Sequence, residues 1–201
     1  MTFEENIQKA LTPFPVLETK RLILREIKYE DAVSVFNFRA DVRVSEFIAR
    51  QPAREIKEAE DLIQRMMDAY NNKQAIGWAA ERKNSADKEI IGACGFNRID
   101  FLNHRAEIGG EMAVNHWGKF FAIEAVKAII DFGFDTLKFH AIEAKLSPLN
   151  KSAIYLLEKL GFRKEAHFHD YYLFEGNYQD LAVYTAFNSV STPASLSEKQ
   201  A

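Results

Sequence analysis

The chain has 201 residues, of which 47% are hydrophobic and 27% charged, so it is long enough to bury a sizeable core, and we predict a single domain. Its net charge of −3 and isoelectric point near 6.0 argue against a general nucleic-acid binder, and no apolar run reaches the roughly 18 residues of a membrane span. The one cysteine, Cys94, leaves no internal disulfide framework. We therefore expect a soluble cytoplasmic protein, a monomer or homodimer, with neither nucleic acid nor a membrane among its partners.

The N-terminal part is predicted to contain an extension, one strand and a group of helices. Residues 1–16 have a short helical pattern that Pro13 and Pro15 interrupt, so we expect an N-terminal extension to a domain spanning residues 17–187. Hydrophobic periodicity predicts a strand at Arg21–Ile27 and helices at Tyr29–Arg39, Val42–Ile48 and Arg54–Tyr70. We interpret Met66 and Met67 on the last helix as core residues.

The remaining chain alternates strands with two helices. Strands are predicted at Gln74–Arg82, Glu89–Ile99, Arg105–Val114 and Phe139–Leu146, and helices at Trp117–Leu137 and from Asn150 to Gly161. Strands at Phe162–Phe174 and Tyr178–Phe187 should form a hairpin with a turn at 175–177, where Gly176 and Asn177 are able to take positive φ, and residues 188–201 should be a disordered tail. This order predicts an α+β fold, with helices flanking a mixed, largely antiparallel sheet that contains one parallel pair.

The turn from Asn115 to Ala122 is a candidate anion site. It follows an apolar strand, contains Gly118 and opens a helix with an apolar stripe. The N–H groups of a first helical turn have no intrahelical partner and lie at the positive end of the helix dipole, so they can bind a phosphate. Lys119 adds a positive charge there. Many turns with one glycine bind nothing, however, so the turn alone is a weak signal.

Sequence signals mark both ends of the second helix. Asn150 is the predicted N-cap, with Ser152 in the first turn. At the other end Gly161 is expected in the left-handed conformation, with Phe162 packed back on Leu157 in a Schellman motif.

These stretches resemble the acetyl-CoA-binding and following motifs of the GNAT acetyltransferases, most closely the RimJ/RimL-type branch that acetylates ribosomal-protein N-termini. The resemblance covers about residues 15–187, and its most specific part is 150–162. The residues that carry it are Leu17–Arg25, Glu107-Ile108-Gly109, Trp117-Gly118-Lys119, Phe121-Ala122, Glu124-Ala125, Pro148–Ala153 and Leu157–Phe162.

This resemblance implies a GNAT-like sheet of six to seven strands, splayed apart around the helix at 117–137. It also implies acetyl-CoA as co-substrate, an amine as acceptor and no metal. The residues that it assigns to cofactor binding are Met112, Ala113, Val114, Trp117, Gly118, Lys119, Phe120, Phe121, Ala122, Asn150 and Ser152.

Phe120 departs from the family pattern, which usually has a second glycine at this position. Glycine lets the backbone approach the pyrophosphate closely, whereas a phenylalanine forced to positive φ is strained. If Phe120 instead adopts ordinary helical φ, its N–H still points at the ligand and only its side chain must turn away.

Acetyl transfer to an amine requires a group that accepts the proton of the ammonium and a group that protonates the leaving thiolate. Glu107 and Glu111 are the candidate bases, because both lie in the strand next to the presumed cofactor; each is also compatible with surface charge. They share one face of a regular strand, and a bulge at Gly109-Gly110 would turn one of them away. The resemblance makes Ser152 and Tyr155 candidate acids, with helix capping and packing as their respective alternatives.

Other residue types that often mark a functional site have plainer interpretations here. We interpret Cys94 as a small buried hydrophobe rather than a nucleophile. His167 and His169 are two apart and would face one way on a strand, which allows a metal pair, but no third ligand is apparent, and we favour acceptor contact or surface placement. By resemblance, the loop near 49–53 and a set of polar residues border the acceptor; the set is Asp170, Tyr171 and Asp180.

The leading hypothesis is an acetyl-CoA-dependent N-acetyltransferase in which the amine attacks the thioester directly with help from a general base. The acceptor is either a protein N-terminus or a small-molecule amine. A non-catalytic acyl-CoA-binding or partner-binding domain on the same fold is the alternative that Phe120 motivates.

Overall fold

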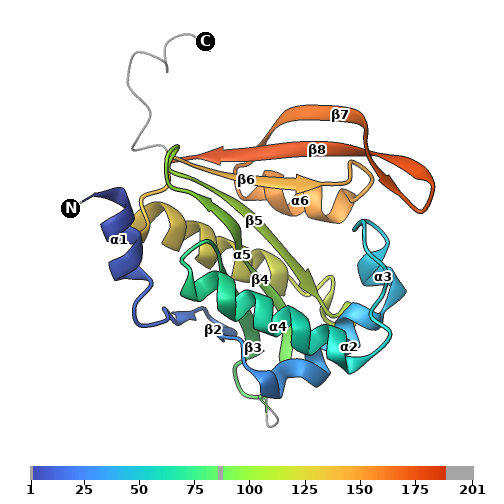
Figure 1. Ribbon diagram of the computed structural model, residues 1–201, viewed down its shortest axis with the longest axis horizontal. Coiled ribbons are helices and arrows are strands. Elements are labelled where there is room, and N and C mark those ends of the chain that lie inside the picture. The colour runs from blue at the N-terminus through green and yellow to red at the C-terminus, as the bar shows by residue number, and fades with distance from the viewer. Residues whose placement is uncertain (1, 86–87, 189–201) are drawn as a thin grey trace.

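One mixed sheet runs through the computed structural model, which describes residues 2–85 and 88–188 (Figure 1). The strand order is β1-β2-β3-β4-β5-β6-β8-β7, and every neighbouring pair is antiparallel except β5 and β6. The strands are β1 (Leu17–Glu18), β2 (Leu22–Glu26), β3 (Ile76–Arg82), β4 (Ile90–Asp100), β5 (Arg105–Met112), β6 (Ala141–Leu146), β7 (Arg163–Phe174) and β8 (Asn177–Phe187). The α-helices are α1 (Phe3–Ala10), α2 (Ala32–Ala40), α3 (Val42–Ser45), α4 (Ile56–Asn71), α5 (Phe121–Asp131) and α6 (Lys151–Lys159).

The predicted fold class is confirmed, and two predicted elements are corrected. The described sheet has eight strands rather than six or seven, because Leu17–Glu18 pairs with β2 as a short additional strand. The predicted helix at Trp117–Leu137 is instead a 3₁₀ turn at Val114–His116, then α5, then a π-helical turn at Phe132–Thr136. The α-helix cannot begin at Trp117 because Gly118 and Phe120 have positive φ.

Helices cover both faces of the sheet. Neighbouring residues of β3 point to opposite faces of the sheet and belong to different core clusters. Trp78 packs in the cluster that includes α5, and Ala79 packs in the cluster that includes α2 and α4. The α5 cluster also contains Ile7 and Leu11 from the N-terminal segment, both fully buried. Met66 and Met67 pack on the second cluster, in line with their interpretation as core residues. No helix in the described part of the chain is long and apolar enough to cross a bilayer.

The parallel pair at the centre of the sheet separates soon after it forms. β5 and β6 are paired only from Arg105 to Glu107, whose partner is Glu143, after which β5 continues to Met112 and β6 to Leu146. Figure 1 shows the two strands fanning apart from this common end. The splay that the sequence resemblance implies is therefore present.

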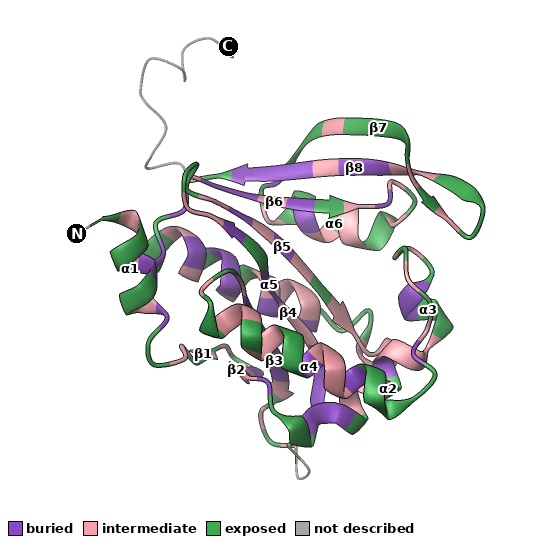
Figure 2. Ribbon diagram, viewed as in Figure 1, coloured by how far each residue is buried: buried purple, intermediate pink, exposed green. Residues whose placement is uncertain are grey.

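A long hairpin forms the far edge of the sheet. Figure 2 shows that its outer strand β7 is largely exposed, whereas β8 beside it is largely buried. The predicted turn is present, and Gly176 has positive φ in it together with Glu175, whereas Asn177 is already paired with Phe174 in the ladder. The tail predicted at 188–201 lies outside the described residues except for Asn188.

Candidate functional site

The turn between β5 and α5 has the backbone shape of an anion cradle. Gly118 has φ +69° and Phe120 has φ +62°, so both occupy the left-handed region on either side of Lys119. Phe120, which stands where the family pattern usually has glycine, is therefore left-handed, and its side chain is 68% exposed. In the described part of the chain, none of the five N–H groups from Gly118 to Ala122 has a hydrogen-bond acceptor. Adjacent, unpaired N–H groups in such a turn are suited to bind phosphate oxygens.

Two cationic side chains lie near the cradle. Lys119 lies in the turn, where its Nζ donates a hydrogen bond to the Asn115 carbonyl at 2.8 Å. The Arg82 guanidinium lies 5.9 Å from the centroid of the Phe121 ring. Burial, together with Arg82 and Lys119, lowers the pKa of His116 below its ordinary value. A dianionic pyrophosphate would find a complementary field here.

Hydrogen bonds from the segment between β1 and β2 hold the first turn of α5 in position, and the sequence analysis did not predict them. Glu124 in the first turn of α5 accepts hydrogen bonds from the Arg21 Nε at 2.7 Å, the Arg21 backbone N–H at 2.7 Å and the Thr19 hydroxyl at 2.5 Å. Arg21 also donates to the Lys119 carbonyl at 3.0 Å. Thr19, Arg21 and Glu124 all lie within the segments that carry the resemblance, but only the tertiary structure shows that they are partners.

The predicted pantetheine contacts lie at the end of β5. The Met112 carbonyl accepts a hydrogen bond from the Trp117 indole at 2.8 Å, and the Ala113 N–H donates to the Ile91 carbonyl at 2.9 Å. Trp117 is 46% exposed. Val114 begins the 3₁₀ turn that follows.

The two candidate bases on β5 have different surroundings. No register shift occurs at Gly109-Gly110; the bulge lies opposite, in β4 between Phe96 and Arg98, so Glu107 and Glu111 face the same side. Glu111 is 17% exposed, and both of its carboxylate oxygens are bound, one by Arg39 at 2.6 Å and one by Arg50 at 2.5 Å.

Glu107 keeps one oxygen available. Its Oε2 accepts a hydrogen bond from the Lys145 Nζ at 2.8 Å, and its Oε1 has no partner in the described part of the chain. Glu107 pairs with Glu143 at the point where β5 and β6 separate, so it lies at the apex of the splay.

The other side of the splay leads from β6 into α6. The Asn150 Oδ1 accepts the Ala153 N–H at 3.1 Å, which confirms Asn150 as the N-cap. Ser152 in the first turn is exposed and makes no capping bond, and Tyr155 is 56% exposed rather than packed in the core. Both hydroxyl groups are therefore accessible from solvent.

The remaining candidates are Cys94 on β4 and the polar residues of the β7–β8 hairpin. Cys94 is half-buried, and burial raises the pKa of its thiol to about 12, so it is protonated and unreactive at neutral pH. Asp170 and Tyr171 are exposed on β7, and Asp180 lies opposite on β8, where it contacts both His167 and His169.

Comparison with known proteins gives one family. The model of the acetyltransferase (GNAT) domain matches residues 21–163. Uncharacterized N-acetyltransferase p20 of Bacillus licheniformis is 40% identical over 84% of this chain and 94% of its own. Spermidine N(1)-acetyltransferase of Vibrio cholerae is 26% identical over 80% of this chain and 90% of its own. The crystal structure of ribosomal-protein-S5-alanine acetyltransferase from Vibrio fischeri superposes with a TM-score of 0.75 at 24% identity, over 89% of this chain and all of that one.

Proposed function

Because this chain belongs to the GNAT family and is an acetyl-CoA-dependent N-acetyltransferase, we propose that its acceptor is the N-terminal amine of a peptide or protein. The observation that carries the proposal is an exposed apolar hairpin next to the splayed strands. The roles of individual residues in cofactor binding and catalysis, given below, are part of the same proposal.

The cofactor lies across the splay. The N–H groups of Gly118 to Ala122 hold the pyrophosphate, because they are unpaired in the described chain and lie beside Lys119 and Arg82. The pantetheine runs along the edge of β5 that faces the gap, towards the end of the strand at Met112, Ala113 and Val114. The Ala113 N–H and carbonyl are already bound to the Ile91 carbonyl and the His116 N–H, so the backbone contacts come from Met112 and Val114. For the Met112 carbonyl to contact the pantetheine, the Trp117 indole must release it.

Glu107 is the general base in this mechanism. The amine nitrogen attacks the thioester carbonyl carbon, the new C–N bond forms as the C–S bond breaks, and the amine proton passes to the free Oε1 of Glu107, directly or through water. Glu111 is less suited to this role because two guanidinium groups already occupy its oxygens.

The leaving thiolate takes its proton from a hydroxyl group on α6. Ser152 and Tyr155 are both exposed on the helix that follows β6, on the side of the splay opposite the β5–α5 turn. Asn150 holds the start of that helix in place and can also contact the pantetheine. The products are CoA with a free thiol and the acetylated amine.

The hairpin β7–β8 supports a peptide as acceptor. Four of its apolar and aromatic side chains are between 46% and 65% exposed: Phe168, Tyr171, Leu173 and Tyr178. At its tip, Glu175 accepts a hydrogen bond from Gln51 in the loop between α3 and α4, so the hairpin bridges to the helices beyond the splay. A small polar amine would leave this apolar surface exposed, whereas a peptide chain can cover it.

A small-molecule polyamine is the second candidate, favoured by the relative that acetylates spermidine. The carboxylates of Glu107 and Glu143 lie together at the apex of the splay and would attract a cationic amine. Lys145 contacts both of them and reduces this attraction.

Release of CoA thiol from acetyl-CoA tests the acceptor. We expect turnover with peptides that have a free N-terminus and none with the same peptides blocked at the N-terminus. Turnover with spermidine, and with no peptide that has a free N-terminus, would mean that the acceptor is a polyamine. Turnover with neither class would contradict both.

Calorimetric titration with acetyl-CoA tests the cradle separately from the acceptor. Gly118→Val should weaken acetyl-CoA binding, because a β-branched residue at φ +69° is strained although nothing lies within 4 Å of the new Cβ. Gly176→Val is the matched control, since it has φ +78° and an equally open Cβ position in the hairpin turn. Equal affinities in the two variants and the parent would rule out this turn as the pyrophosphate site.

A further inference from the structure

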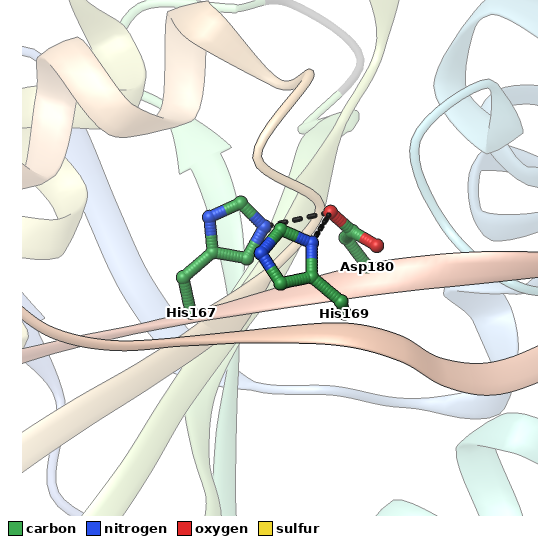
Figure 3. Close-up of side chains that lie close together, drawn as sticks. All are labelled: His167, His169 and Asp180. Atoms are coloured by element: carbon green, nitrogen blue, oxygen red, sulfur yellow. Dashed lines mark hydrogen bonds and ion pairs between the residues drawn. The ribbon is translucent and has the colours of Figure 1, made fainter.

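Two histidines and an aspartate converge on the β7–β8 hairpin, as Figure 3 shows. The His167 Nε2 lies 2.7 Å from the Asp180 Oδ2, and the His169 Nδ1 lies 3.0 Å from the same oxygen. The two imidazole centroids are 4.4 Å apart. One potential ligand atom from each residue can be chosen such that all three lie within 4.8 Å of one another.

The register of β7 against β8 accounts for this convergence. His167 is paired with Ala182, two residues after Asp180 on β8, so both side chains project from one face of the hairpin. Between Phe168 and Tyr172, β7 gains two residues relative to β8, and Asp170 within this bulge has φ +50°. Because Phe168 is paired with Leu181, the same register brings His169 beside Asp180. Left-handed backbone at a non-glycine residue is often retained where it serves a function.

We propose that His167, His169 and Asp180 form a binding site for one divalent transition-metal ion of the zinc type. Two imidazole nitrogens and a carboxylate oxygen are a donor set that zinc binds with three protein ligands, leaving a fourth position for water or another ligand. In a tetrahedral site with bonds of about 2.0 Å, the ligand atoms are roughly 3.3 Å apart. The two nitrogen-to-oxygen distances of 2.7 and 3.0 Å are therefore a few tenths of an ångström short of this geometry.

The surroundings of the site position the carboxylate. The Asp170 backbone N–H donates to the Asp180 Oδ1 at 3.0 Å, and this bond leaves Oδ2 directed at the two rings. A metal ion would replace the two hydrogen bonds to Oδ2 and would keep the bond from Asp170.

Lys164 provides a sharp test of this geometry. Its Nζ lies 3.3 Å from the His167 Nδ1 and can act only as a donor. When a metal binds Nε2, Nδ1 carries the proton and needs an acceptor, so the lysine must turn away. Lys164→Glu supplies that acceptor and should strengthen metal binding. Lys164 is exposed, so the change does not disturb the core.

The experiment is calorimetric titration of the untagged full chain with Zn²⁺, and separately with Mg²⁺. We expect one zinc ion per chain and no comparable binding of Mg²⁺, which prefers oxygen ligands. Both His169→Ala and Asp180→Asn should weaken zinc binding by at least about tenfold. His104→Ala, which removes an exposed histidine elsewhere, is the matched control and should bind as the parent does.

Circular dichroism verifies that each variant is folded. The proposal is overturned if the parent binds no zinc, or if zinc binding survives His169→Ala and Asp180→Asn unchanged. A weaker site in Lys164→Glu would show that His167 does not bind through Nε2. Because the measurement needs neither acetyl-CoA nor an acceptor, its result is independent of the proposed acetyl transfer.

Discussion

At the scale of single residues, Phe120 has a backbone conformation that its side chain disfavours. We expect Phe120→Gly to raise the free energy of unfolding by about 0.5–1 kcal/mol, because relief of the left-handed strain exceeds the entropy cost of glycine. Phe120→Ala keeps the Cβ and should give no gain. Urea denaturation of both variants checks this, and equal stabilities would mean that the strain at this residue is negligible.

The two glutamates of β5 should respond differently to one substitution. Glu111→Gln breaks an ion-pair triad that is mostly buried and leaves Arg39 and Arg50 unneutralised, so the unfolding free energy should fall by about 3 kcal/mol. Glu107→Gln should change stability by less than about 1 kcal/mol, since its one ion pair is more exposed.

Glu107→Gln should reduce turnover more than Glu111→Gln does, although it should reduce stability less. Glu107→Gln should lower kcat by about 10²–10⁴-fold if it removes the general base. Steady-state kinetics at a temperature where both variants remain folded distinguishes the two roles. An unchanged kcat in Glu107→Gln together with a large loss of kcat in Glu111→Gln would mean that Glu111, and not Glu107, is the general base.

His116 should make the fold sensitive to acid. Its pKa in the folded state is below the ordinary value of 6.5, chiefly because of burial, so the unfolded chain binds the proton more readily. The stability that depends on neutral His116 is therefore present above about pH 6.5 and is lost as the pH falls through the folded-state pKa. His116→Gln should show a smaller loss of unfolding free energy between pH 7 and pH 5 than the parent. Parallel pH profiles would contradict this account.

At the scale of elements, helix α6 could be predicted in detail because its signals are local. The predicted Schellman ending is confirmed: the Phe162 N–H donates to the Leu157 carbonyl at 3.0 Å, and the Gly161 N–H donates to the Glu158 carbonyl at 3.1 Å. Gly161 has φ +86°, and nothing lies within 4 Å of the position that a Cβ would occupy, so only backbone strain opposes a side chain. Gly161→Ala should lower the unfolding free energy by about 1 kcal/mol, measured by thermal denaturation; an unchanged midpoint would mean that the turn adapts.

Features that depend on distant partners could not be predicted from periodicity. Arg39 and Glu111 are 72 residues apart in the sequence, and their ion pair becomes visible only when α2 packs beside β5. The predicted start of α5 is wrong for a different reason, because a phenylalanine gives no signal of left-handed backbone. Resemblance alone places Asp180 near the acceptor, and its contact with both histidines depends on the register between β7 and β8, which the sequence pattern does not specify.

At the scale of the whole molecule, the N-terminal helix belongs to the core. Ile7 and Leu11 are fully buried, the Tyr70 hydroxyl donates to the Leu11 carbonyl at 2.6 Å, and the Trp78 indole donates to the Pro15 carbonyl at 2.7 Å. Removal of residues 2–16 should lower the unfolding free energy by about 3–6 kcal/mol from these two apolar side chains alone.

Ile7→Ala is the milder test if the truncated chain fails to fold. It should cost about 3 kcal/mol in urea denaturation. Removal of even a single buried methylene lowers the unfolding free energy by at least about 0.5 kcal/mol. A smaller loss in Ile7→Ala would show that α1 is only loosely attached.

The separation of β5 and β6 leaves a row of peptide groups, from Ile108 to Met112, without a neighbouring strand on one side. An open strand edge normally lies at the rim of a sheet, where charge or a covering loop protects it. Here the edge is internal, and the proposed occupant is a small molecule that arrives and leaves in every cycle. The empty enzyme would then be the form most exposed to proteases and to pairing with foreign strands, so the cellular supply of acetyl-CoA would govern the lifetime of the protein as well as its rate.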